Sequence, residues 1–277
     1  MIFDNDLKSL KRNGYLLIKN IFTEKEVIEL RNKSLEYFSN DNNHFVYHNC
    51  GKVLPNAFEY FQDLRSVLNN KVVSLAKELL GNDIYYIYHS DLHYNMFNNW
   101  HRDLSDQYID GFNTLQTFTK AKIYKIAIYL QDHSSDNRGL SLIPKSHNTF
   151  DEKNFEDELT IHPNMGDIII FDQRLMHKGD RIDPESVEVC KWIEQNSSNI
   201  DEDKFKYFKT KREKTDSTKL SVFFGIGYSD EITKEFAKAT IRRQNIQNNV
   251  KDYQISIEFK RYLNDIGLPA LDLEGDK

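Results

Sequence analysis

Two His-x-Asp triplets place a histidine and an aspartate where both could bind one metal ion. They are His89-Ser90-Asp91 and His101-Arg102-Asp103. In an extended segment, residues i and i+2 project to the same face, and imidazole and carboxylate groups bind Fe(II), Mn(II) and Zn(II). With nine histidines and 25 aspartates among 277 residues, about one such triplet is expected by chance. A triplet alone is therefore weak evidence for a metal site, and the residues around each triplet must decide which one could bind metal.

The second triplet has the stronger surroundings. Trp100 precedes His101, and the segment Gly-Asp-Ile-Ile-Ile-Phe-Asp at 166–172 ends shortly before His177. A histidine that follows a later strand can join His101 and Asp103 in a 2-His-1-carboxylate facial triad. Such a triad leaves coordination positions of Fe(II) open, and these suit a chelating cosubstrate and O₂.

The first triplet is the rival for the metal role, and we expect it to stay outside the metal site. His89, Asp91 and His93 lie in an alternating run and would face the same side. These polar groups would then line a substrate pocket. We also expect His147 to be structural and to hold the turn over 144–147.

The metal ligands must be positioned by a chain that changes from helical to β character near residue 84. The predicted single domain, 1–277, has a helical scaffold over 1–83, a β core over 84–227 and a C-terminal helical region over 230–277. In the scaffold, a short strand over 14–20 is followed by a helix that opens with a capping box at 23–26 and by a second helix over 64–80. This order predicts a β-sandwich or barrel with helices packed outside. The predicted core strands are 84–88, 122–130, 140–143, 159–162, 167–171 and 220–226.

Composition argues against several classes of protein. The chain has 37 basic and 43 acidic residues and a net charge of −6, which makes nonspecific nucleic-acid binding unlikely as its main activity. Its two cysteines, Cys50 and Cys190, are far apart, so neither a disulfide framework nor a thiolate zinc site is expected. No apolar run approaches the roughly 20 residues of a membrane helix, and the first residues do not read as a signal peptide. We therefore predict a cytoplasmic protein that does not interact with a membrane.

Several segments match the motifs of a known family in the family's order. They are 13–20, Trp-His-x-Asp at 100–103, 126–132, 139–147, Gly-Asp-x-x-x-Phe-Asp at 166–172, and His177 with Gly179. From about Gly14 to Gly227 the chain resembles the phytanoyl-CoA dioxygenase family of Fe(II)/2-oxoglutarate-dependent oxygenases. The segment 139–147 is similar to the family's Gly-rich Pro-Gly-Ser-His turn, with Arg138 and Lys145 where the family has glycine. The resemblance implies a double-stranded β-helix core, which is a jelly-roll, cupin-like fold.

By this resemblance His101, Asp103 and His177 are the Fe(II) ligands, and 2-oxoglutarate and O₂ are cosubstrates. Family members bind the distal carboxylate of 2-oxoglutarate with an arginine on the strand after the second histidine, often with Ser or Thr two residues later. The matching positions here are Lys219 and Ser221. Lysine supplies the charge but lacks the bidentate fork of arginine. Arg181, four residues after His177, is the alternative anchor.

The long polar segment 181–219 predicts an insertion or lid beside the barrel mouth.

For the whole chain we predict hydroxylation of a small or medium-sized metabolite, anionic or sugar-like. The alternatives are a cupin-like metal- or ligand-binding protein without turnover and a metal-dependent isomerase or hydrolase. Neither the substrate nor the oligomeric state follows from the sequence.

Overall fold

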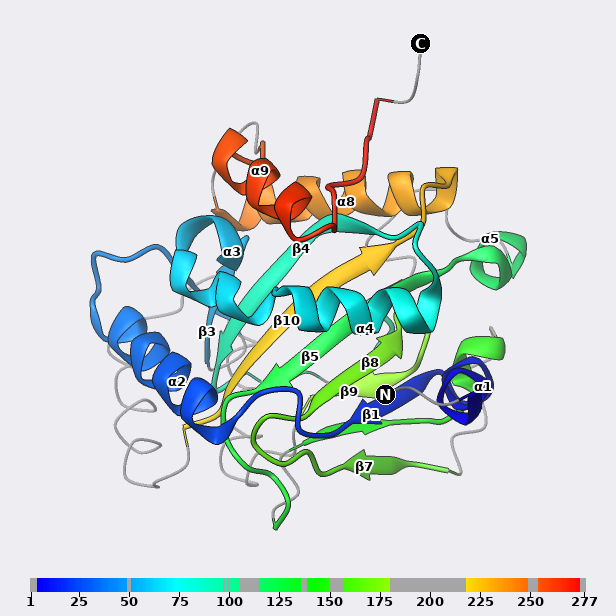
Figure 1. Ribbon diagram of the computed structural model, residues 1–277, viewed down its shortest axis with the longest axis horizontal. Helices are drawn as coiled ribbons and strands as arrows, with labels where there is room; N and C mark the ends of the chain where they lie inside the picture. The colour runs from blue at the N-terminus through cyan, green and yellow to red at the C-terminus, as the bar shows by residue number, and fades with distance from the viewer. Residues whose placement is uncertain are drawn as a thin grey trace, which may run out of the picture.

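The computed structural model describes residues 4–48, 51–96, 98, 100–104, 115–135, 139–149, 157–179, 218–248 and 254–274. Its strands form two antiparallel sheets with helices outside (Figure 1). The large sheet has the strand order β1-β8-β5-β10-β4-β3-β2, and the small sheet has the order β7-β6-β9. This arrangement confirms the prediction of a mainly β fold with flanking helices and a jelly-roll core.

The large sheet contains seven strands. Their bounds are β1 Tyr15–Ile18, β2 Val46–His48, β3 Gly51–Pro55, β4 Tyr85–Tyr94, β5 Ile123–Tyr129, β8 Ile168–Asp172 and β10 Leu220–Gly227. The small sheet is built from β6 Leu140–Leu142, β7 Leu159–Ile161 and β9 His177–Lys178. The sequence analysis missed β2 and β3, because each is only a few residues long and Gly51 and Pro55 read as turn residues.

The helices lie mainly on the outer face of the large sheet. Figure 1 shows α2, α3 and α4 across that face and α8 and α9 at one end. Their bounds are α1 Asp4–Asn13, α2 Glu24–Ser39, α3 Ala57–Tyr60, α4 Asn70–Leu80, α5 Leu115–Lys120, α8 Glu231–Asn248 and α9 Ile257–Asp265, with 3₁₀ helices at Gln62–Val67 and Ser146–Asn148. The capping box predicted for α2 is present, since Thr23 Oγ1 accepts from Glu26 N and Glu26 accepts from Thr23 N. No helix in the described ranges is both long and apolar enough to span a membrane.

The helix predicted over 64–80 is two helices. The side chain of Asn69 accepts hydrogen bonds from the backbone N–H groups of Lys71 and Val72, so it caps a new helix start. The preceding turn closes as the 3₁₀ helix Gln62–Val67. Side-chain capping therefore prevailed over the continuous apolar face from which one helix was predicted.

Two apolar layers pack on the two faces of the large sheet. Outward-facing residues of β10, such as Leu220, Val222 and Phe224, belong to the cluster that also contains the helix residues Val27, Leu64 and Leu75. Inward-facing Tyr129 and Phe223 pack with residues of the small sheet. The odd-numbered residues from Lys219, just before β10, to Gly225 therefore face the space between the sheets.

Strand β4 carries a bulge next to His89. Its register with β10 shifts between the pairs Phe224–Ser90 and Ile226–Tyr86, and Tyr88 there has a φ of 60°. The shift inserts two extra residues of β4, and this even number preserves the alternation, so Ile87 and His89 both face inward. The strand was predicted to end at Tyr88, but it continues to Tyr94 and so includes the whole His89-Asp91-His93 row.

Lys145 adopts the left-handed conformation, with a φ of 69°. This is the position where the family motif has glycine, and a non-glycine residue there costs roughly 1–2 kcal/mol. We expect Lys145→Gly to raise the free energy of unfolding by about 0.5–1 kcal/mol in urea denaturation, since part of the gain is lost to backbone entropy. Lys260→Gly, on the exposed side of α9, should instead lower it by about 1 kcal/mol. A loss of stability in both variants would contradict the strain at Lys145.

Two predictions fall largely outside the described residues. Of the predicted insertion over 181–219, the structure describes only 218 and 219. The lid therefore stays a prediction, and so does the role of Arg181 as the alternative anchor for 2-oxoglutarate.

Candidate metal centre

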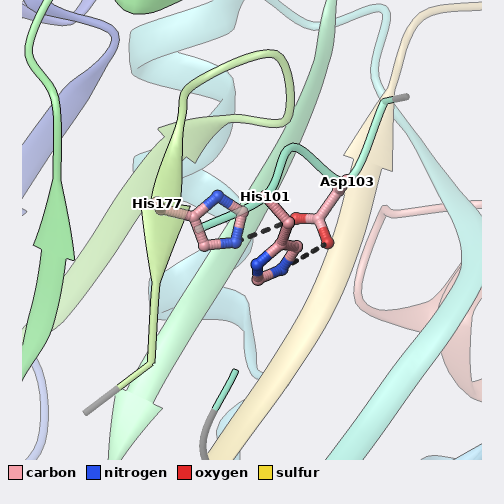
Figure 2. A group of neighbouring side chains, drawn as sticks. All are labelled: His101, Asp103 and His177. Carbon is pink, nitrogen blue, oxygen red and sulfur yellow. Dashed lines mark ion pairs between the residues drawn. The ribbon is translucent and has the colours of Figure 1, made fainter. Parts of the chain in front are cut away.

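Three side chains from two distant segments meet between the sheets. His101 and His177 pair through both backbone N–H···O hydrogen bonds, each 2.9 Å, and this pairing brings Asp103 beside them. His177 Nε2 lies 3.5 Å from Asp103 Oδ2, and His101 Nε2 lies 3.9 Å from Asp103 Oδ1 (Figure 2). Among the described residues, these are the only His, Cys, Asp or Glu side chains found grouped closely enough to hold an ion. The structure thus brings together all three residues singled out in the sequence.

The protonation state of His177 suits a divalent cation. Burial, followed by the charge of His101, lowers the pKa of His177 to about 3, so its imidazole is neutral. His177 Nδ1 lies 2.9 Å from the carbonyl oxygen of Leu175 and donates to it, which leaves Nε2 as the ligand atom. Metal bonds of about 2.0–2.2 Å place two ligand atoms at most about 4.4 Å apart. The two measured separations from Asp103 fall within this limit.

Lys125 is the residue of this site that the sequence analysis overlooked. Its Nζ lies 2.8 Å from Asp103 Oδ2, and both side chains are nearly buried. Burial alone would raise the pKa of Asp103, but the charges of Lys125 and the two histidines outweigh it and hold the pKa well below its ordinary value. A signal for Lys125 existed: it is the single charged residue in the apolar strand β5, at an inward position of the alternation.

The turn over 144–149 supports both ligand segments. Ser146 Oγ accepts a hydrogen bond from Met176 N, next to His177, and Arg102 Nη2 donates to the carbonyl oxygens of Ser146 and Thr149. His147 Nε2 lies 3.1 Å from the carbonyl oxygen of Lys11 and binds no ligand residue, in agreement with the expected structural role. This turn therefore fixes the spacing between His101 and His177.

The Gly-Asp-x-x-x-Phe-Asp segment anchors the strand that leads to His177. Gly166 has a φ of 93°, and a Cβ there would lie 2.2 Å from the carbonyl oxygen of Phe22, so only glycine fits without a shift. The carboxylate of Asp167 accepts from the backbone N–H groups of Asn20 and Asn164. Asp172 forms a two-point ion pair with Arg174, at 2.9 and 2.6 Å, in the turn before His177. The motif is thus a structural support for the metal ligand.

Lys219 and Ser221 both face the interior, while Leu220 packs outward, as their spacing predicts. Both side chains are buried, and Lys219 Nζ lies 5.4 Å from the ring centre of Tyr129. Ser221 pairs with Tyr129 on one side and with His93 on the other. These residues occupy the same inner face of β10 as Gly225, which pairs with Lys125.

His89 does not join the triad. It is buried, and its Nε2 lies 2.9 Å from Asp91 Oδ2. Asp91 Oδ1 accepts from Gln244 Nε2 of α8 at 3.2 Å. The row on β4 therefore forms a separate polar group, which shares a small cavity with Asp103.

Solved structures share this fold at low sequence identity. EctD from S. alaskensis, solved with 2-oxoglutarate and 5-hydroxyectoine, is 18% identical with a TM-score of 0.58, over 82% of this chain and 77% of that chain. The alpha ketoglutarate-dependent carbocyclase SnoK from nogalamycin biosynthesis is 14% identical with a TM-score of 0.58, over 83% and 85%. At these identities the likeness concerns the fold.

Sequence comparison gives the family. Ectoine dioxygenase from Streptomyces coelicolor is 26% identical over 170 residues, which cover 52% of this chain; the match spans about half, 51%, of that protein. The family model for phytanoyl-CoA dioxygenase (PhyH) matches residues 10–183, a segment that contains His101, Asp103 and His177 and ends before Lys219. With a match over more than half of its length, the chain belongs to the phytanoyl-CoA dioxygenase family.

Proposed function

We propose that this protein is an Fe(II)- and 2-oxoglutarate-dependent oxygenase that hydroxylates a small or medium-sized molecule. The convergence of His101, Asp103 and His177 between the two sheets carries the proposal. Membership of the phytanoyl-CoA dioxygenase family supports it. A cytoplasmic location remains part of the same proposal.

The three ligands would hold Fe(II) on one face, and the bound iron supplies the activation of O₂. The chain's own residues set the conditions for this chemistry. His177 presents Nε2 because Leu175 fixes its other nitrogen. Lys125 keeps the Asp103 carboxylate ionised and oriented. The apolar residues between the sheets, such as Phe171 and Tyr129, exclude bulk water from the site.

Lys219 and Ser221 would bind the distal carboxylate of 2-oxoglutarate. A carboxylate buried between the sheets needs a cation and a hydrogen-bond donor, and the inner face of β10 offers an ammonium and a hydroxyl two residues apart. The pair lies beyond the segment that the family model matches, so the sequence match adds nothing here.

This assignment predicts a ranking of two variants. We expect Lys219→Met to weaken 2-oxoglutarate binding by roughly 10- to 100-fold, the loss for a charge-assisted hydrogen bond of about 1.5–3 kcal/mol, and to leave Mn(II) binding unchanged. Arg181→Ala should bind 2-oxoglutarate like the wild type. Calorimetric titration of 2-oxoglutarate into the Mn(II)-loaded proteins measures both. The opposite ranking would move the anchor to Arg181.

Substrate-dependent release of succinate tests the proposed class. Full-length protein with Fe(II), 2-oxoglutarate and O₂ should release succinate, and a substrate in a metabolite panel should increase that release and gain one oxygen by mass spectrometry. A cupin-like binding protein, or a metal-dependent isomerase or hydrolase, would release none. The panel should contain sugars and hygromycin B, since HygX of similar fold was solved with nickel, 2-oxoglutarate and hygromycin B.

A further inference from the structure

A small buried cavity adjoins the metal centre on the side of α8. Its volume is about 10 Å³, close to the minimum that holds one water molecule or one non-hydrogen atom of a ligand. Three elements close it: β4 with His89, the turn after β8 with Gln173, and α8 with Phe236, Thr240 and Arg243. Asp103 forms part of the wall. Any group that enters this cavity lies directly beside a proposed Fe(II) ligand.

Two side chains of the cavity present hydrogen-bond acceptors. His89 Nε2 lies 2.9 Å from the Asp91 carboxylate and therefore carries the hydrogen, which leaves Nδ1 as an acceptor. Burial lowers the pKa of His89, in keeping with a neutral ring. Gln173 donates through Nε2 to the carbonyl oxygen of Tyr124, which leaves Oε1 as an acceptor.

Neither acceptor has a hydrogen-bond partner among the described residues. His89 Nδ1 and Gln173 Oε1 are both buried and unsatisfied there. Each such group costs roughly 1–3 kcal/mol, and folded proteins contain few of them. A ligand group that donates a hydrogen bond to each acceptor would remove this cost.

Both acceptors are held rigidly. Gln173 N donates to the carbonyl oxygen of Ile123, and Gln173 O accepts from Leu104 N. On the other side, Gln244 of α8 holds the carboxylate of Asp91 and so fixes the ring of His89. Preorganised acceptors of this kind bind a ligand without an additional ordering cost.

We propose that this cavity is a substrate subsite in which His89 Nδ1 and Gln173 Oε1 accept hydrogen bonds from an O–H or N–H group next to the carbon that is oxidised. The inference rests on the proposed function and names the chemistry of the substrate at that site. A hydroxyl or amino group can donate to these acceptors, whereas a carboxylate or phosphate offers them only further acceptors.

The test follows the ring nitrogens of His89 by NMR in full-length, ¹⁵N-histidine-labelled protein. Zn(II) replaces Fe(II) as a diamagnetic ion, and 2-oxoglutarate is present. The probes are glycerol and methylammonium as donors and acetate as an acceptor-only compound of similar size. Glycerol or methylammonium should shift the His89 Nδ1 resonance saturably, and acetate should not. The probe that shifts it distinguishes a hydroxyl subsite from an amine subsite.

Gln173→Met removes one acceptor and preserves the volume of the side chain. It should weaken binding of the effective probe by roughly 3- to 10-fold, the loss of one hydrogen bond, while exposed Gln62→Met has no effect. A shift caused by acetate, equal binding by the two variants, or no shift with any probe would overturn the subsite. Failure of the proposed function would look different, because the wild type would then bind neither Zn(II) nor 2-oxoglutarate.

Discussion

Asp103→Ala is expected to abolish metal binding and 2-oxoglutarate turnover. The substitution leaves two imidazoles and no anionic ligand, so a divalent ion loses both a bond and the charge that offsets its desolvation. Losing an outer partner of a metal ligand already costs about 10–100-fold in affinity. We therefore expect Mn(II) affinity to fall by at least about 100-fold in anaerobic calorimetric titration, with succinate release at background.

Asp91→Ala provides the matched control. It removes the aspartate of the other His-x-Asp triplet, whose side chain is hydrogen-bonded to His89 and Gln244 rather than to the metal ligands. It should keep the wild-type Mn(II) affinity. Asp103→Asn preserves the size of the side chain and removes only its charge, so its Mn(II) affinity shows the effect of the charge. Circular dichroism verifies that each variant is folded. Wild-type Mn(II) affinity in a folded Asp103→Ala protein would remove this aspartate from the ligand set.

Lys125→Met should destabilise the metal-free protein by about 3 kcal/mol, the lower end of the range for removing one partner of a buried ion pair. Lys125 Nζ lies 2.8 Å from Asp103 Oδ2, and the side chains are only 10% and 12% exposed. Without the ammonium, the carboxylate is left in a nearly buried position without its ion-pair partner. Urea denaturation with a chelator present measures the loss in free energy of unfolding.

Metal binding should recover part of this loss, because a bound cation compensates the same carboxylate. Saturating Mn(II) should therefore raise the unfolding midpoint of Lys125→Met more than that of the wild type. Lys122→Met, three residues earlier and exposed, should stay within about 0.5 kcal/mol of the wild type with or without metal. Equal stability of the two variants would show that the ion pair contributes nothing to the metal-free fold.

The sequence by itself singled out the three residues that the structure brings together and most of the strands around them. His101 and Asp103 are close in the chain, so their shared face follows from the period of an extended segment. The strands containing Ile126 or Ile169 are apolar over most of their length because both of their faces are covered, and such runs are readable from residue types. The resemblance to the family motifs adds His177 to this pair from the sequence alone.

The tertiary structure alone decided which polar residues surround those ligands. The register of β5 with β10 directs Lys125 to Asp103, and a one-residue slip would turn it outward. The packing of α8 against β4 encloses His89 beside a cavity shared with Gln173. These contacts join residues far apart in the chain. They depend on strand register and helix packing, and neither leaves a periodic signal in the local sequence.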